Sequence, residues 1–321
     1  MDLRVGFLVY DSRSGSTLLA KVITECFSTV FVTPEIGFDG LLKHGNKWIS
    51  SASHEDIESA LYAKDHYLRN LPIERHTVRQ LIHTRPEHGW TSKELIIGIV
   101  AKAFLAKDGA GIALVIIKNG SHIKFWESLV ATFGQDALFI KIVRDPRAVV
   151  NSKIKTQRPY SPDEKMGWGG VLLAALRWRQ YVMKLFAMQA SQAHVACIHY
   201  EDLLTHPDAV MQSLATFLAC QSKPSESRKR TYVIPDQEKD VHSLVLAKNM
   251  QTSRIEAWKS ELSVQDTSII EAVVWKEMCK LGYSPVTNLK LFDRFCWIIS
   301  MLPSTVWALW THKRLRLSRR R

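Results

Sequence analysis

The sequence LRVGFLVYDSRSGSTLLA, residues 3–20, decides the fold of this chain of 321 residues. Residues 3–10 are almost all apolar and predict a buried strand, and residues 18–27 predict a helix. Between them, residues 11–17 are small or polar and predict a loop. A strand, a small-residue loop and a helix in this order are typical of α/β folds with a parallel sheet.

Strands and helices alternate through much of the remaining chain. Apolar runs predict further strands at 112–117, 138–143 and 194–200. We expect Ser92 to cap a helix before the first of these strands and Gly109 to end it. The fold class is therefore α/β, with a mainly parallel central sheet, helices on both faces and a helical C-terminal tail. Ligands of such sheets bind at the carboxyl ends of the strands.

Local signals also predict helix starts and loops. Asp145 and Pro146, soon after the strand at 138–143, predict the cap and the first residue of the next helix. The polar stretches 156–170 and 221–240 predict loops, which either cover a binding site or only connect elements.

The positive charge of the chain is concentrated at its C-terminal end. The formal net charge is +12, and residues 290–321 hold eight Lys or Arg against one acid, Asp293. The remainder is only mildly basic, which argues against a nucleic-acid-binding face spread over the fold. The five cysteines are scattered without a C-x-x-C pair, and no signal-peptide pattern precedes the first strand, so we expect a reducing, cytoplasmic compartment.

The loop after the first strand has the chemistry of a phosphate site. Successive backbone N–H groups at the start of a helix attract an anion, and here they would come from Ser14, Gly15, Ser16, Thr17 and Leu18. Arg13 adds a cation, and two hydroxyl side chains add donors. The loop lacks the Gly-Lys pair of a Walker motif, and a plain tight turn is the alternative.

A second anion site is predicted after the strand at 138–143, where residues 143–152 read VRDPRAVVNS. The planar guanidinium of Arg144 matches the oxygens of a phosphate, and Ser152 on the following helix can donate to the same group. The alternative is an ordinary helix start with solvated arginines.

Both segments resemble those of the sulfotransferases that use 3′-phosphoadenosine-5′-phosphosulfate (PAPS). Arg13 and the Gly-Ser-Thr at 15–17 are similar to that family's 5′-phosphosulfate loop, and Arg144 and Ser152 resemble its 3′-phosphate contacts. The pattern is closest to the carbohydrate-type and bacterial branch. The resemblance implies a P-loop NTPase-like fold and sulfuryl transfer from PAPS to a hydroxyl, without a metal.

Three further positions resemble the same family. Tyr200, in YEDLL (200–204), matches a tyrosine near the adenine, and we expect Asp202 to cap the helix. Lys118 matches a strand-end lysine that approaches the sulfuryl group, although a solvated strand terminus is the alternative. Arg254 matches a 3′-phosphate contact, but the Arg-Lys-Gly found there in many cytosolic relatives is absent.

The implied reaction needs in-line attack by a hydroxyl, so positioning and charge stabilisation dominate catalysis. Arg13 and Lys118 would oppose the growing negative charge. Glu35, in Thr-Pro-Glu after a short apolar run, is the expected general base; His122 is the rival, and a third possibility is that neither acts. The twelve histidines show no metal-ligand spacing.

The last residues, 289–321, are expected to form a tail outside a sulfotransferase domain at 1–288. Residues 295–310 are apolar and aromatic but fall short of the roughly 20 residues that span a bilayer. With the basic residues behind them, they fit either an interfacial helix on an anionic membrane or a helix docked on the core. Membrane binding would favour a glycolipid or lipid-linked acceptor over a free carbohydrate or other small molecule.

Two other functions share these features. A P-loop kinase-like phosphoryl transferase would have the same sheet and loop, but should also carry a Walker lysine and a magnesium-binding Asp at a strand end. Neither is evident in the sequence. A catalytically silent, membrane-attached nucleotide-binding protein would bind PAPS without transferring its sulfuryl group.

Overall fold

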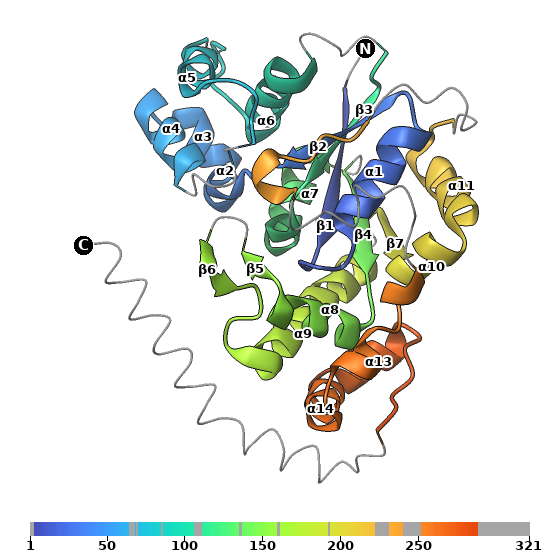
Figure 1. Ribbon diagram of the computed structural model, residues 1–321. Helices are drawn as coiled ribbons and strands as arrows, with labels where there is room; N and C mark the ends of the chain where they lie inside the picture. The colour runs from blue at the N-terminus through green and yellow to red at the C-terminus, as the bar shows by residue number, and fades with distance from the viewer. Residues whose placement is uncertain are drawn as a thin grey trace. The chain divides into compact units, whose positions relative to one another are not determined.

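The computed structural model (Figure 1) describes most of the chain up to Thr287: residues 3–63, 68, 70–84, 86–105, 111–134, 137–158, 161–191, 193–221, 231–239 and 252–287. The contacts of the chain divide it into two compact units. Unit 1 comprises residues 1–10, 15–142 and 184–236, and unit 2 comprises residues 11–14, 143–183 and 237–321. The tail predicted at 289–321 lies outside the described residues.

Unit 1 is built on a five-stranded sheet with the strand order β2-β3-β1-β4-β7. The pairs β1–β3, β1–β4 and β2–β3 are parallel. The strands are β1 (Arg4–Tyr10), β2 (Val30–Glu35), β3 (Leu114–Lys118), β4 (Leu138–Val143) and β7 (Val195–His199). The four apolar runs singled out in the sequence are therefore strands, and the predicted mainly parallel sheet is confirmed.

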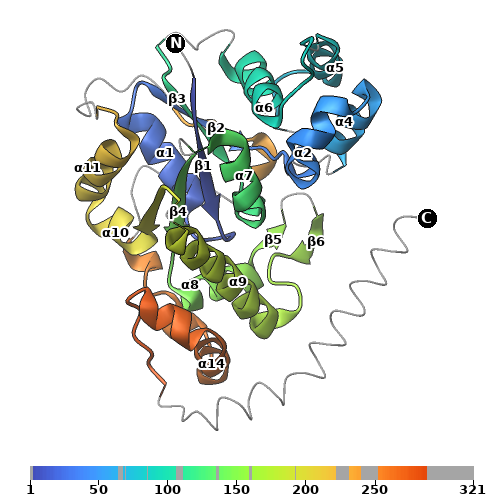
Figure 2. The same ribbon diagram turned by 180° about the vertical axis from the view of Figure 1, so that it is seen from behind.

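The central strands are buried on both faces. Every residue of β3 and β4 is buried, as is every residue of β1 after Arg4. Continuous apolar burial of this kind is expected where helices cover both faces of a parallel sheet. Helix α1 (Ser16–Cys26) lies in front of the sheet in Figure 1, and α7 (Trp126–Phe133) lies in front of it in Figure 2.

The other helical elements of unit 1 lie between β2 and α7 and after β7. They are α2 (Asp39–His44), α3 (Asn46–Ser51), α4 (His54–Tyr62), α5 (Arg75–His83), α6 (Ser92–Val100), the π-helix η2 (Ala101–Leu105), the 3-10 helix η3 (Gly120–Phe125), α10 (Tyr200–Thr205) and α11 (Pro207–Leu218).

Two predicted helix caps are wrong. Helix α6 is capped by Thr91 rather than Ser92, because Thr91 and Glu94 form a reciprocal capping box. Asp202 lies inside the first turn of α10, whose N-cap residue is His199. In that turn the Asp202 carboxylate still complements the helix dipole. The predicted helix end at 109 lies outside the described residues.

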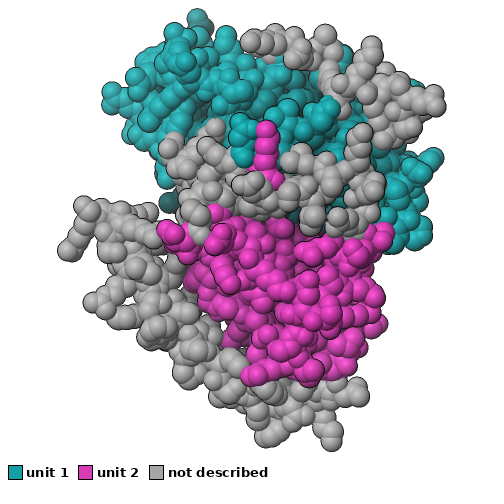
Figure 3. Space-filling view, in the orientation of Figure 1, with its two compact units in different colours: residues 1–10, 15–142, 184–236 teal, residues 11–14, 143–183, 237–321 magenta. Residues whose placement is uncertain are grey.

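Unit 2, drawn in magenta in Figure 3, is mainly helical in its described part. Helix α8 begins at Pro146 with Asp145 as its N-cap, as predicted. It packs against α13 and α14. The elements are α8 (Pro146–Lys155), β5 (Gln157–Arg158), β6 (Ser161–Lys165), the 3-10 helix η7 (Thr252–Arg254), α13 (Trp258–Glu261) and α14 (Val264–Lys280); α9 (Gly170–Ala190) and η6 (Asp236–Glu238) each have residues in both units.

The polar stretch at 156–170 is more ordered than a loop. Gln157 pairs with Lys165 and Arg158 with Ser161, so β5 and β6 form an antiparallel hairpin. The prediction of a simple loop is therefore wrong for this stretch. No helix within the described residues is both long enough and apolar enough to cross a membrane.

Candidate functional site

The first candidate site is the loop that connects β1 to the N-terminus of α1. Its backbone is unusual, because Arg13 has φ 71° and Gly15, the N-cap of α1, has φ 92°. The first hydrogen bond of α1 runs from the Leu19 N–H to the Gly15 carbonyl at 3.0 Å. Residues 16–18 form the first turn of α1, where the positive end of the helix dipole favours an anion.

Tyr200 lies directly against this loop in unit 1. A Cβ built on Gly15 would stand 2.2 Å from Cδ2 of the Tyr200 ring, so only glycine fits at that position. Tyr200 itself is 9% exposed and begins α10, directly after β7. Its predicted contact with an adenine stays a prediction, but its place beside the phosphate loop is consistent with it.

Four of the predicted binding residues meet in unit 2. The Arg13 Nε donates to the Ser152 Oγ at 2.9 Å. The Arg144 guanidinium donates to the Arg13 carbonyl at 3.3 Å through Nη1 and to the Arg254 carbonyl at 2.8 Å through Nη2. We call Arg13, Arg144, Ser152 and Arg254 the arginine cluster. Arg254 contributes its carbonyl oxygen to these contacts, while its guanidinium Nη1 lies 3.9 Å from the Glu261 carboxylate. The guanidinium groups of Arg13 and Arg144 and the Ser152 hydroxyl form a group suited to a multiply charged anion.

Buried contacts with neighbouring residues hold the arginine cluster in place. The indole Nε1 of Trp178 donates to the Arg144 carbonyl at 3.1 Å. Lys153, the neighbour of Ser152 on α8, forms a buried ion pair with Asp11 at 2.6 Å. Burial lowers the pKa of Lys153, and the Asp11 carboxylate opposes that effect. This pair ties the phosphate loop to α8 within unit 2, so Arg13 reaches Ser152.

The other arginine of the VRDPRAVVNS segment is structural. Arg147 is 4% exposed and bonds to Asp145 and to Glu271, at 2.7 Å in each case. Its guanidinium also lies 4.0 Å from the centre of the Trp258 ring. Arg147 therefore holds α8 to α13 and α14 and is not available to a ligand.

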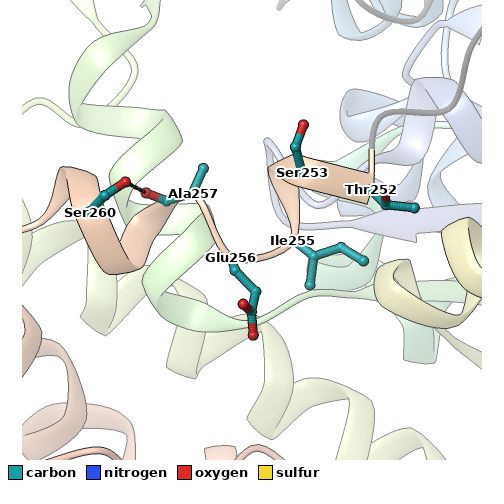
Figure 4. A pocket seen from close by; sticks show the side chains of 6 residues that line it. All are labelled: Thr252, Ser253, Ile255, Glu256, Ala257 and Ser260. Atoms are coloured by element: carbon teal, nitrogen blue, oxygen red, sulfur yellow. Dashed lines mark hydrogen bonds between the residues drawn. The ribbon is translucent and has the colours of Figure 1, made fainter.

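An open pocket of about 620 Å³ lies along residues 252–260, on either side of Arg254 in the sequence (Figure 4). Its polar side chains do not converge, since Ser253 and Glu256 point in opposite directions and Ser260 bonds to the Ala257 carbonyl at 3.2 Å. The lining residues are Thr252, Ser253, Ile255, Glu256, Ala257 and Ser260. None of them was predicted to bind a ligand, and their polar groups are not arranged around a common point where a ligand could bind.

Glu35 and Lys118 lie next to each other at the ends of neighbouring strands in unit 1. They are register partners at the carboxyl ends of β2 and β3. Glu35 is partly exposed, whereas Lys118 is 1% exposed. The Lys118 Nζ lies 5.5 Å from the centre of the Tyr10 ring and 5.9 Å from the centre of the Tyr232 ring. This ammonium is thus not a solvated strand terminus.

A buried polar network holds the two strand ends together. The Asn119 amide donates to the Ile36 carbonyl at 2.9 Å, and the Ser121 hydroxyl donates to the Asp39 carboxylate at 2.7 Å. In addition, the Asn70 amide donates to the Glu35 carbonyl at 2.8 Å. The main chain on either side of Glu35 is therefore fixed.

His122 belongs to the same region but is enclosed. It is 0% exposed, and its Nε2 accepts a hydrogen bond from the Phe38 N–H at 3.2 Å. Burial lowers the pKa of His122 to about 4, with the nearby Asp39 opposing the shift. A fully enclosed ring that already accepts a backbone hydrogen bond is poorly placed to take a proton from an acceptor. The geometry favours Glu35 for that role, which remains a prediction.

The sequence did not predict several residues that contact the arginine cluster or the strand ends at Glu35 and Lys118. Asp11, Asn119 and Tyr10 stand beside predicted site residues in the sequence, but their partners are distant along the chain. Tyr232 comes from the polar stretch 221–240, which carried no signal for burial. Among the described residues, no group of three or more His, Cys, Asp or Glu side chains is arranged to hold a metal ion.

Comparisons with known proteins agree with this architecture. A family model described as the sulfotransferase family matches residues 7–224, which is more than half of the chain. No curated protein sequence matches the chain.

Two solved structures are similar over nearly the whole chain. The sulfotransferase domain from the Synechococcus PCC 7002 olefin synthase is 18% identical with a TM-score of 0.58, over 88% of this chain and 95% of that one. The sulfotransferase domain from the curacin biosynthetic pathway is 16% identical with a TM-score of 0.58, over 88% of this chain and 99% of that one. Their likeness confirms the predicted P-loop-like sulfotransferase fold. With the family model matched over most of the sheet and both predicted anion-binding segments, the chain belongs to the sulfotransferase family.

Proposed function

We propose that this protein transfers a sulfuryl group from PAPS to an acceptor hydroxyl by in-line displacement. The observation that carries the proposal is the arginine cluster. Arg13, Arg144, Ser152 and Arg254 were each predicted to contact PAPS, and hydrogen bonds join all four within unit 2. An ordinary helix start with solvated arginines would not bring them together.

The proposed donor contacts follow from the geometry of the two anion sites. The arginine cluster would bind the 3′-phosphate, because Arg144 and Ser152 offer directed N–H and O–H donors to its oxygens. The Ser14 N–H donates to the Asp11 carbonyl at 3.2 Å, so of the predicted residues 14–18 the backbone N–H groups of 15–18 would bind the 5′-phosphosulfate at the start of α1. Tyr200, packed against Gly15, would lie near the adenine.

In the proposed reaction the acceptor oxygen forms a bond to sulfur while the bond from sulfur to the bridging oxygen breaks. The electron pair of that bond stays on the 5′-phosphate of the departing adenosine 3′,5′-bisphosphate. Lys118 and Arg13 would offset the negative charge that develops there. Glu35 would accept the proton of the acceptor hydroxyl. The protein's contribution is mainly positioning and charge stabilisation, as expected for transfer of an anionic group.

The acceptor is proposed to be a carbohydrate, a glycolipid or another small hydroxyl compound. Residues 1–288 would form the sulfotransferase domain, and residues 289–321 would bring it to an anionic membrane surface through their basic side chains. The neighbouring structures are named for an olefin synthase and for the curacin pathway, so hydroxyls of natural-product intermediates belong in the same test.

The test is transfer of radiolabelled sulfate from PAPS to a library of sugars, glycolipids and natural-product alcohols. We expect transfer by the wild type and a loss of about 100-fold or more in Glu35→Gln. The matched control is His122→Gln, which should keep most of the activity because the His122 ring is enclosed. Equal losses in the two variants would contradict the assignment of Glu35, and absence of transfer to every acceptor would contradict the proposed function.

A further inference from the structure

Lys118 is held between two tyrosine rings that come from different parts of unit 1. Tyr10 is the last residue of β1, and Tyr232 belongs to the described segment 231–239, coloured orange near β2 and β3 in Figure 1. The Lys118 ammonium lies within 6 Å of both ring centres, at 5.5 and 5.9 Å. A cation at this distance from an aromatic face is attracted by the ring quadrupole.

Tyr232 is tied to the same strand ends as the lysine. Its hydroxyl donates to the Thr33 carbonyl at 3.3 Å. The Thr33 hydroxyl in turn accepts from the backbone N–H of Lys118 at 3.1 Å. Thr33 thus connects the ring and the lysine main chain, and Tyr232 is only 6% exposed.

The position of Tyr10 is constrained by the close approach of Gly120. A Cβ built on Gly120 would stand 2.6 Å from the Tyr10 carbonyl oxygen and 3.3 Å from the Tyr10 ring. The glycine two residues after Lys118 therefore lets the Tyr10 ring sit close to the end of β3. Both rings are fixed by contacts that do not depend on the lysine side chain.

We infer that Tyr232 is a positioning residue that, together with Tyr10, fixes the Lys118 ammonium at the carboxyl edge of the sheet, where Glu35 is the register partner of Lys118. A buried ammonium needs compensating groups, and the faces of the Tyr10 and Tyr232 rings contribute to that compensation. The inference rests on the proposed function, in which Lys118 offsets the charge that develops during transfer. Tyr232 would thereby give residues 231–239, the described part of the polar stretch 221–240 apart from Gln221, a role in placing Lys118.

The first experiment measures the place of Lys118 without any turnover. In protein labelled at the lysine Cε positions, ring currents should move the Lys118 Hε resonances upfield, and Lys118→Arg assigns them by removing them. Tyr232→Phe keeps the ring and should keep the shift, whereas Tyr232→Leu should lose a large part of it. Lys153, paired with Asp11 in unit 2, is the internal control and should not move.

Two results of this experiment would overturn the inference. One is a wild-type Lys118 resonance at the position of exposed lysines, and the other is a shift that survives in Tyr232→Leu. Neither result depends on the protein's activity, so the placement of Lys118 is decided even if PAPS is not turned over.

The second experiment asks whether Tyr232 acts through Lys118. Release of adenosine 3′,5′-bisphosphate from PAPS is measured for Tyr232→Leu, Lys118→Met and the double variant. We expect Tyr232→Leu to lower kcat by about 10- to 100-fold with little change in KM for PAPS, since misplacing a charged group has effects of this size. The double variant should be no slower than Lys118→Met alone. Additive losses would overturn the inference, while absence of turnover in the wild type would count against the proposed function instead.

Discussion

Arg144 shows how much of this site depends on single side chains with directed contacts. It lies between the end of β4 at Val143 and the N-cap of α8 at Asp145. Its carbonyl accepts from the Trp178 indole, and its guanidinium donates to the carbonyls of Arg13 and Arg254. A surface arginine would make no such set of contacts. The residue is thus fixed in place before any ligand binds, which reduces the entropy lost on binding.

Gly15 provides a test of the phosphate loop at the residue scale. Gly15→Ala must accommodate both a positive φ of 92° and a Cβ that stands 2.2 Å from the Tyr200 ring. Gly282→Ala is the matched control, because Gly282 has φ 83° and nothing lies within 4 Å of its Cβ. We expect the control to cost about 1 kcal/mol of unfolding free energy and Gly15→Ala to cost clearly more. Denaturant unfolding measures both, and equal losses would contradict the packing of Tyr200 on the loop.

His122 predicts a pH dependence of stability. The pKa of His122 is lowered by burial from 6.5 to about 4 in the folded protein, so the unfolded chain takes up the proton at higher pH than the folded one. Its contribution to stability is therefore complete above pH 6.5 and is lost as the pH falls towards 4, amounting to about 3 kcal/mol.

The measurement for His122 is the free energy of unfolding in denaturant at several pH values between 7 and 4. His122→Gln keeps an acceptor for the Phe38 N–H but does not titrate, so its curve should be flatter by the same amount. Parallel curves for the two proteins would show that His122 is not buried in its neutral form.

At the scale of elements, the ion pair at the start of α8 should matter more than an exposed one. Arg147→Met leaves Asp145 and Glu271 buried without their partner and should cost about 3–5 kcal/mol. Lys259→Met removes the partner of the exposed Glu256 and should cost less than about 1 kcal/mol. Thermal and denaturant unfolding compare the two. Similar costs would mean that Arg147 does not hold α8 to its neighbours.

The elements also show what the sequence could predict. The strands followed from apolar runs because a parallel strand covered on both faces needs no polar residues. The end of β4 and the cap at Asp145 followed from local rules, and the residues of the arginine cluster followed from a family resemblance. Thr91 could have been chosen over Ser92, since Glu94 lies three residues after Thr91 and completes a capping box.

Other features depend on long-range contacts that no local pattern reveals. The hairpin of β5 and β6 is made of short, polar strands without alternation, so it reads as a loop. Tyr232 reaches Lys118 and Thr33 across more than a hundred residues of sequence. The predicted capping role of Asp202 is wrong because α10 begins at Tyr200, two residues before Asp202.

At the scale of the whole molecule, the excess charge in the tail predicts membrane binding. Replacing Lys313, Arg314 and Arg316 together with Arg319, Arg320 and Arg321 by Gln should weaken binding to vesicles that contain phosphatidylserine, by roughly 1 kcal/mol for each charge near the surface. Cosedimentation at low and high salt measures this, and affinity for adenosine 3′,5′-bisphosphate should not change. Unaltered vesicle binding would remove the proposed role of the tail.

If the chain binds PAPS through the arginine cluster, calorimetric titration with adenosine 3′,5′-bisphosphate should detect the binding. Wild type is compared with Arg13→Ala, Arg144→Ala and the control Arg75→Ala, whose arginine pairs with Glu58 in unit 1. We expect binding by the wild type and the control, a loss of about 2 kcal/mol or more in the other two variants, and poor binding of ATP. Absence of binding in a folded wild type, or equal affinity in all four proteins, would contradict binding through the arginine cluster.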